Sequence, residues 1–78
     1  MEKTVSLNHL PLGKTGRVKS LAAEGNMRRR LMDLGLVQNT KVEALRRSPS
    51  GDPVAYQIRG AVIALRSEEA SKIYVDLC

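Results

Sequence analysis

The chain has 78 residues, of which 42% are hydrophobic, and a formal net charge of +5. A chain this short buries only roughly 60–65% of the surface that it exposes when unfolded, which leaves little room for a deep catalytic cavity. It contains two Tyr and no Phe or Trp, too few aromatic rings for a proline-rich peptide groove or a single-strand nucleic-acid platform. We therefore expect one domain, residues 1–78, that functions through its surface.

Charge and cysteine usage bear on partners and location. The basic balance fits either an ordinary solvated surface or an acidic partner. The single cysteine, Cys78, fits a reducing cytosolic setting. The first residues, MEKTVSLNHLPLG, lack the apolar run that a signal peptide would show, and no stretch approaches the roughly 18 apolar residues of a membrane span. The sequence therefore predicts a cytoplasmic protein.

The first predicted elements are a turn and a strand. Asn8 is suited to cap a single helical turn, and Pro11-Leu12-Gly13 then redirects the backbone. Loose alternation around Val18 predicts a strand over residues 15–21.

Residues 25–36 are predicted to form a helix with Asn26 as its N-cap. Apolar side chains recur at i, i+4 and i+7 on one face, at Met27, Leu31 and Leu34. Gly35 stands where a left-handed residue ends a helix, and a Schellman motif then packs Leu36 on Leu31.

The second half of the chain is predicted to be mostly strands, at residues 40–47, Val54–Ile58 and Ala61–Leu65. Residues 48–53 form a loop of turn-favouring residues, and Gly60 separates the last two strands. The near-continuous apolar run of Ala61–Leu65 predicts a strand that is covered on both faces.

The C-terminal segment is predicted to be a short helix that Ser67 caps. Its apolar side consists of Ala70, Ile73, Tyr74 and Leu77. The helix would plug one end of the sheet. Five short strands at this spacing predict a small all-β barrel rather than a sandwich.

No motif supports catalysis. Gly13-Lys14-Thr15 resembles the end of a phosphate-binding P-loop, but position 8 is Asn rather than Gly, and a strand follows rather than a helix. His9, the only histidine, has no second ligand at the spacing of a metal site. It lies in a turn-rich segment, so no serine or cysteine nucleophile has a plausible base. Glu68 and Glu69 are adjacent and diverge around a helix. We expect a protein that is not an enzyme, with no catalytic residue, metal site or cofactor.

The strongest polar feature is Arg28-Arg29-Arg30, whose members lie about 100° apart around a helix and cannot enter one small pocket. One interpretation is a solvated face with Arg29 paired to Asp33. The other is a docking surface in which Arg28 and Met32 place charge beside an apolar patch, since Arg and Met are enriched in interfaces. The partner-binding residues predicted on this hypothesis are Met27, Arg28, Arg29, Arg30, Met32, Leu36, Ser50 and Asp52.

These motifs together resemble the FeoA family, the small cytosolic proteins of bacterial ferrous iron uptake. The matching segments are residues 7–18 (LNHLPLGKTGRV), 28–36 (RRRLMDLGL) and 48–54 (SPSGDPV), followed by Arg59-Gly60, Ala64-Leu65-Arg66 and Glu69-Ala70. The resemblance implies an SH3-like five-stranded barrel with one inserted α-helix. It also implies a non-enzymatic protein, peripheral to the inner membrane, that docks on the cytosolic G-protein domain of the iron transporter FeoB to assemble or regulate it.

Two other hypotheses stay open. Residues 13–18 (GKTGRV) also resemble the glycine-containing loop of a small ribosomal or RNA-binding barrel of the KOW type, which the net charge favours. The scarcity of aromatic residues opposes it, and we expect no nucleic-acid partner. A small barrel can also form a homo-oligomer by pairing an open strand edge across a two-fold axis.

Overall fold

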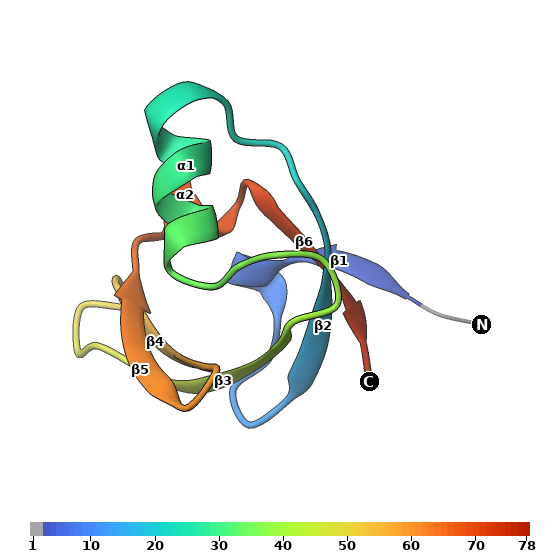
Figure 1. Ribbon diagram of the computed structural model, residues 1–78. Helices are drawn as coiled ribbons and strands as arrows, with labels where there is room; N and C mark the ends of the chain where they lie inside the picture. Colours follow the sequence, from blue (N-terminus) through green and yellow to red (C-terminus); the bar gives the residue numbers. More distant parts are fainter. Residues whose placement is uncertain (1–2) are drawn as a thin grey trace.

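The computed structural model describes residues 3–78, whose six strands form one antiparallel sheet in the order β1-β6-β2-β3-β4-β5. The strands are β1 (Thr4–Ser6), β2 (Thr15–Leu21), β3 (Lys41–Arg47), β4 (Val54–Ile58), β5 (Ala61–Leu65) and β6 (Ile73–Leu77). The helices are a 3-10 turn η1 (Leu7–His9), α1 (Gly25–Asp33) and α2 (Ser67–Ala70). The sheet curls around the core, and α1 and α2 lie together above it (Figure 1).

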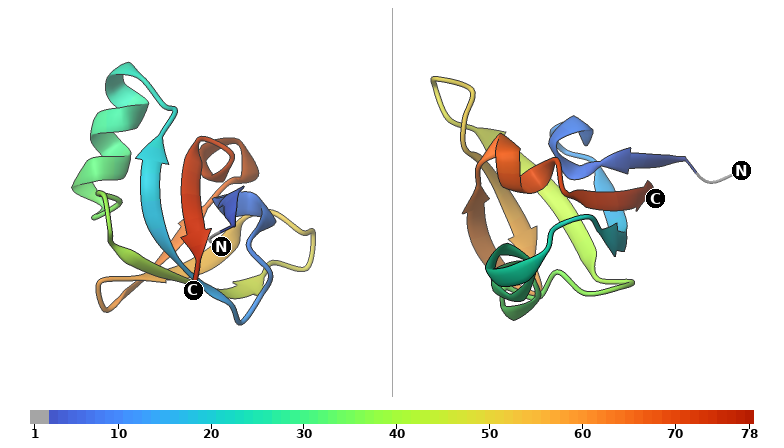
Figure 2. Two further views of the ribbon diagram at one scale, coloured as in Figure 1. Left: turned by 90° about the vertical axis from the view of Figure 1, so that its right-hand side faces the viewer. Right: turned by 90° about the horizontal axis from the view of Figure 1, so that it is seen from above.

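The all-β class and the helix inserted after the first long strand are confirmed, but the strand count and the closure differ from the expectation. There are six strands rather than five, and the C-terminal segment that was expected to be helical forms one of them, β6. The sheet does not close into a barrel, because β1 and β5 end the strand order without pairing with each other. Thr4 lies opposite Asp76, so β1 and β6, the first and last strands of the described chain, lie side by side (Figure 2).

The core follows the period-two alternation of the strands. Val18, Val42, Tyr56, Ile58 and Val75 all point inward and are at most 2% exposed. Among the described residues, no polar or charged residue is buried with them. The charged side chains therefore remain on the surface, where they can define a site.

Helix α1 begins differently from the prediction and ends as predicted. Glu24 occupies the N-cap position without a side-chain hydrogen bond, so Asn26 lies inside the helix rather than at its cap. At the other end, the Leu36 amide donates to the Leu31 carbonyl over 3.0 Å, and Gly35 has a φ of 101°. This is the predicted Schellman motif.

The first helical turn is also confirmed, but its predicted cap is wrong. Asn8 lies within η1, and its side-chain oxygen accepts a hydrogen bond from the Ser6 hydroxyl at 2.6 Å. Asn8 therefore fixes the local chain without capping the turn.

The prediction of a C-terminal helix through Leu77 is wrong. Helix α2 has four residues, with Arg66 rather than Ser67 at its N-cap position, and β6 follows it. Ile73 is fully buried, whereas Tyr74 points outward, as strand alternation requires. The segment is a strand because it pairs with both β1 and β2, a tertiary constraint that the helical spacing of its apolar residues does not reveal.

Strand β5 was expected to be covered on both faces, and it is not. It forms an edge of the sheet, and Val62 is 57% exposed. Its apolar residues therefore cover one side of the core while leaving an outer face in solvent.

No helix within residues 3–78 is long and apolar enough to cross a membrane.

Candidate partner-binding surface

The residues predicted to bind a partner lie on two different sides of α1. Met27 and Arg30 face a hollow that they share with Asp52, next to α2; we call this the loop hollow. Arg28 and Met32 face the groove between α1 and β2, which we call the helix groove. The structure therefore brings the predicted residues together in two groups rather than one.

The charges of the loop hollow pair with one another. Arg30 forms an ion pair with Glu69, and an Arg66 guanidinium nitrogen lies 3.7 Å from an Asp52 carboxylate oxygen. Asp52 also accepts a 2.8 Å hydrogen bond from the Ser67 amide at the start of α2. These contacts hold α1, α2 and the 48–53 loop together, which gives Arg30 and Asp52 a structural role.

Ser50 is exposed and bonds only within its own loop. Its hydroxyl donates to the Asp52 carbonyl at 3.0 Å and lies 3.2 Å from the Ser48 hydroxyl. The side chain is therefore accessible to a partner, but it also stabilises the loop.

The helix groove combines apolar surface with cationic groups. Met32 is 43% exposed and lines the groove with Val37, which is 36% exposed. Arg28 lies over the same groove and donates from Nη1 to the Leu21 carbonyl at 3.3 Å. Leu36, one of the predicted contact residues, is fully buried beneath it and offers no surface in this conformation. The groove thus places a guanidinium beside an exposed methionine.

Arg29 lines neither the loop hollow nor the helix groove, but it shares a depression with Arg28 and Met32 of the helix groove. It lies on the exposed side of α1, in a shallow depression with Met32 and Asp33. Across residues 3–78, only the Arg30–Glu69 and Arg66–Asp52 contacts qualify as ion pairs. The pairing of Arg29 with Asp33 that a solvated helix face predicts is therefore not formed.

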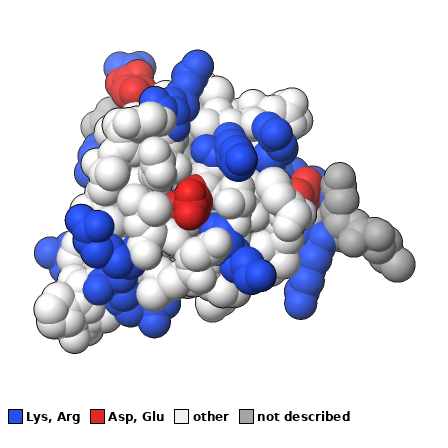
Figure 3. Space-filling view, turned by 90° about the horizontal axis from the view of Figure 1, so that it is seen from below, with Lys and Arg blue, Asp and Glu red and all other residues white. Residues whose placement is uncertain are grey.

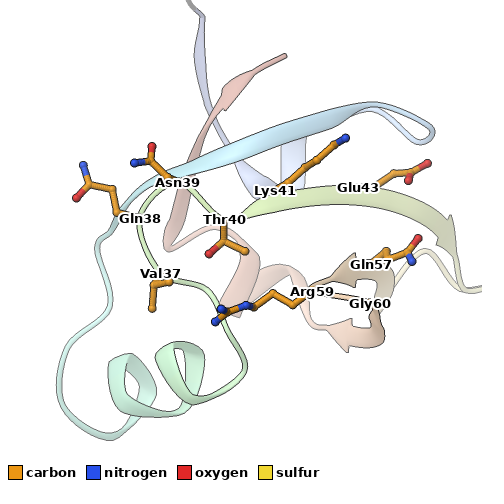
Figure 4. Close-up of a pocket in the computed structure, with 9 residues that line it drawn as sticks. All are labelled: Val37, Gln38, Asn39, Thr40, Lys41, Glu43, Gln57, Arg59 and Gly60. Carbon is orange, nitrogen blue, oxygen red and sulfur yellow. The ribbon is translucent and has the colours of Figure 1, made fainter.

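A further depression was not foreseen from the sequence. It has a volume of about 670 Å³ and lies between the loop after α1 and the turn that joins β4 to β5. We call it the hairpin hollow (Figure 4). Its lining residues are Val37, Gln38, Asn39, Thr40, Lys41, Glu43, Gln57, Arg59 and Gly60. Lys41 and Arg59 both line the hollow because Val42 pairs with Ile58, a register that no local motif indicates.

Positive charge extends from this hollow across the outer face of the sheet. Arg17 of β2 lies opposite Lys41 on one side and opposite Asp76 on the other. Its guanidinium donates to the Asn39 carbonyl at 3.1 Å, which supports the loop beside the hollow. Seen from below, basic side chains surround an acidic group near the centre of the view (Figure 3). Arg17 and Lys41 are like charges opposite each other, which is unfavourable, whereas Asp76 on the other side of Arg17 is a favourable neighbour.

Metal-ligating side chains are not grouped in the described part of the chain. No set of three or more His, Cys, Asp or Glu side chains within residues 3–78 is placed to hold a metal ion. His9 instead lies 2.9 Å from the Ser6 hydroxyl through Nδ1, and Cys78 is exposed.

Comparison with known proteins identifies the relatives of the chain. The family model for the FeoA domain matches residues 5–77. A fusion of Fe(2+) transport protein A with the Fe(2+) transporter FeoB, from Porphyromonas gingivalis, is 31% identical over 71 residues. The match covers 91% of this chain but 8% of the fusion protein, so the chain spans only a small part of that relative.

Solved structures agree with this assignment. The NMR structure of FeoA from Chlorobium tepidum is 42% identical, with a TM-score of 0.87 over 94% of this chain and 70% of that one. The crystal structure of Stenotrophomonas maltophilia FeoA complexed with zinc, described as a procaryotic SH3 domain protein, is 32% identical. Its TM-score is 0.81 over 97% of this chain and 89% of that one. The expected SH3-like fold is confirmed, and the chain belongs to the FeoA domain family.

Proposed function

We propose that this chain is a non-enzymatic accessory protein of bacterial ferrous iron uptake that docks on the cytosolic part of a FeoB-type transporter. The proposal is supported by the relative in which Fe(2+) transport protein A and FeoB form one polypeptide. Two proteins that are fused in one organism commonly act together where they are separate. Docking would hold the chain at the inner membrane through its partner, where it assembles or regulates the transporter.

The helix groove is the surface that best suits such docking. Interfaces combine an apolar centre with flanking polar groups and are enriched in Met and Arg. Met32 and Val37 supply exposed apolar surface, and Arg28 is already positioned by its bond to the Leu21 carbonyl. Because this guanidinium is held in place, a partner would order few additional torsions on binding.

Binding of the purified cytosolic domain of the transporter tests the proposal. Replacement of Arg28, Arg29 and Met32 together by Ala should weaken binding at least about tenfold, which corresponds to roughly 1.4 kcal/mol. Lys72→Ala, which removes a charge from an exposed turn outside both the groove and the loop hollow, is the matched control. Unchanged binding of the triple variant would show that the helix groove is not the docking surface.

The 48–53 loop needs a separate variant, because the charges of the adjoining loop hollow also support the fold and Ser50 does not line that hollow. Ser50→Ala leaves the contacts of Asp52 with Arg66 and Ser67 in place. Weaker binding of this variant would extend the docking surface to the loop, and unchanged binding would confine it to α1.

Nucleotide turnover separates assembly from regulation. The rate of turnover by the intact transporter is measured with and without the chain. A changed rate supports regulation, whereas co-purification at an unchanged rate supports assembly.

The RNA-binding alternative makes a different prediction. Binding to phosphates weakens steeply with salt, by about one unit of logarithmic slope for each phosphate contact. Tight binding of mixed RNA at low salt with such a slope would favour that alternative over docking on the transporter.

Self-association through an open sheet edge is a separate proposal. The free edges are β1 and β5, and antiparallel pairing of two β5 strands around Ile63 would place Arg66 of one copy opposite Gly60 of the other. That arrangement brings Arg66 close to Arg59 of the other copy, so charge repulsion opposes it. Sedimentation at low and high salt tests this, since a β5-paired dimer should strengthen as salt rises.

A further inference from the structure

We propose that the hairpin hollow binds a carboxylate side chain of a protein partner and that Arg59 is the group that pairs with it. The proposal adds a second contact surface to the helix groove and states the chemistry of its ligand. It does not depend on which protein supplies the carboxylate.

The backbone holds Arg59 in an unfavourable conformation at the edge of the hollow. Its φ is 52°, and with Gly60 at 83° it forms the two-residue turn between β4 and β5. Such turns favour Asn, Asp or Gly at the first position because positive φ is costly for other residues. Asn39 lines the same hollow and also has a positive φ. Within residues 3–78, Arg59 and Asn39 are the only non-glycine residues with a positive φ. Asn adopts a positive φ readily, so Arg59 is the strained residue of this hollow, and a strained residue at a surface depression supports a functional role there.

The Arg59 side chain is also directed into the hollow. Its Cδ lies 2.8 Å from the position that a Cβ on Gly35 would occupy, so the aliphatic part of the chain lies over that glycine. Figure 4 shows the side chain extending from the turn toward Val37 and Thr40. A glycine at position 35 is therefore what allows the guanidinium to reach this side of the hollow.

The cations of the hollow have no partner in the described chain. Arg30 and Arg66 form ion pairs, and Arg17 and Arg28 donate to backbone carbonyls. Within residues 3–78 neither Arg59 nor Lys41 takes part in an ion pair or a side-chain hydrogen bond. Five N–H donors of a planar guanidinium therefore remain available to a ligand.

The walls of the hollow favour a carboxylate on a peptide over a chain of phosphates. Gln38, Asn39 and Gln57 contribute amide groups that can pair with the peptide groups of a partner. Glu43 lies among them, which would repel the closely spaced charges of a nucleic acid. A guanidinium matches one carboxylate through two parallel hydrogen bonds, so a single acidic side chain satisfies Arg59.

The hairpin hollow is continuous with the helix groove. Val37 and Gln38 line both, so exposed apolar surface at Met32 and Val37 leads directly to Arg59. One partner surface with an apolar residue beside an acidic one would fit the two depressions together. This is the usual arrangement of an apolar interface centre and a polar rim.

NMR titration of the isotope-labelled chain tests the proposal with a defined probe. The probe is an acetylated peptide with three Glu separated by Gly, and the matched control peptide carries Gln at the same positions. We expect shifts of the Arg59 Nε–H group and of the Thr40 and Gly60 amides, and binding of the Gln peptide at least about tenfold weaker.

Two variants keep the test independent of folding. Arg59→Gly removes the guanidinium while placing the residue best suited to positive φ in the turn, so it should fold and lose the shifts. Lys72→Gln removes the same charge elsewhere and should retain them. The proposal is wrong if the shifts persist in Arg59→Gly, if they spread over all basic residues, or if inorganic phosphate or mixed RNA binds at this place more tightly than the Glu peptide.

Different results would contradict the carboxylate site at Arg59 and the docking on the transporter domain. Binding of the Glu peptide at Arg59 without binding of the transporter domain would support the hollow and contradict the docking. Binding of the transporter domain that is equally tight to Arg59→Gly, together with no peptide binding, would support the docking and contradict the hollow.

Discussion

The Cδ of Arg59 lies 2.8 Å from the position that a Cβ on Gly35 would occupy, so the end of α1 and the β4–β5 turn are in close contact. Gly35→Ala should lower the free energy of unfolding by about 1–2 kcal/mol, because φ is 101° and an added methyl also displaces Arg59. Gly60→Ala is the matched control, since its φ is 83° and nothing lies within 4 Å. Both substitutions strain the backbone, but only Gly35→Ala also displaces Arg59. Equal losses of stability in urea unfolding would therefore mean that displacing Arg59 costs nothing.

Glu69 should matter more to stability than its ion-pair partner. Its carboxylate accepts a 3.1 Å hydrogen bond from the Arg66 amide in addition to pairing with Arg30. Glu69→Ala should cost about 1 kcal/mol through loss of the capping interaction. Arg30→Ala should cost less than about 0.5 kcal/mol, because its side chain is 56% exposed. Thermal unfolding of both variants checks this, and a larger loss for Arg30→Ala would contradict it.

Edge strand β5 should accept proline at one position and reject it at the next. Ile58 and Ala61 flank the two-residue turn and pair with each other, so alternation directs the Ile63 amide toward β4 and the Ala64 amide away from it. Ala64→Pro should cost less than about 1 kcal/mol, whereas Ile63→Pro should cost about 3 kcal/mol or more. Urea unfolding measures the stability of the two variants. Equal losses would mean that both amides donate hydrogen bonds to β4, which would contradict the prediction.

Tyr56 should make the stability depend on pH in the alkaline range. Burial raises the pKa of Tyr56 above 10.0, an effect that the charge of Arg47 opposes and that of Asp52 reinforces. The unfolded chain therefore ionises first, so stability is fully present below about pH 10 and falls as pH rises through the folded pKa. Tyr56→Phe removes this contribution and a 3.3 Å hydrogen bond to the Leu7 carbonyl, at a cost of about 0.5–1.5 kcal/mol at neutral pH.

Urea unfolding of the wild type and Tyr56→Phe at pH 8 and pH 11 measures that contribution. The stability advantage of the wild type should be smaller at pH 11 than at pH 8. A difference that stays constant between the two pH values would mean that the hydroxyl ionises as freely in the folded chain as in the unfolded one.

Local signals predicted the elements that local contacts determine. The glycine at position 35 and the leucine after it specify the end of α1, since the Schellman bonds join residues only five apart. The alternation of apolar and polar residues over Val54–Ile58 is also a local signal, and it predicted β4. The C-terminal helix was wrong because the spacing of Ala70, Ile73 and Leu77 suits a helix, while pairing with β1, more than sixty residues away in sequence, selects a strand.

The binding surfaces depend even more on distant pairing. The prediction of Arg28 and Met32 used their helical spacing and the enrichment of Arg and Met in interfaces, and the structure places both in one groove. The presence of Lys41 and Arg59 in one hollow depends on the register of β3 with β4, which no short motif encodes. Leu36 was also predicted to be a contact residue, but it is fully buried, because the Schellman motif turns it into the core.

The pairing of β1 with β6 has a consequence for how the domain can be tethered. Because Thr4 lies opposite Asp76, any polypeptide that continues beyond either strand starts from the same part of the surface. Cys78 lies there in one depression with Gln38 and Asn39, which also line the hairpin hollow. A short covalent link at this point gives a partner an effective concentration on the order of millimolar. In a fused protein, contacts too weak to join two separate chains would then suffice, whereas a free chain must obtain its affinity from the surface alone.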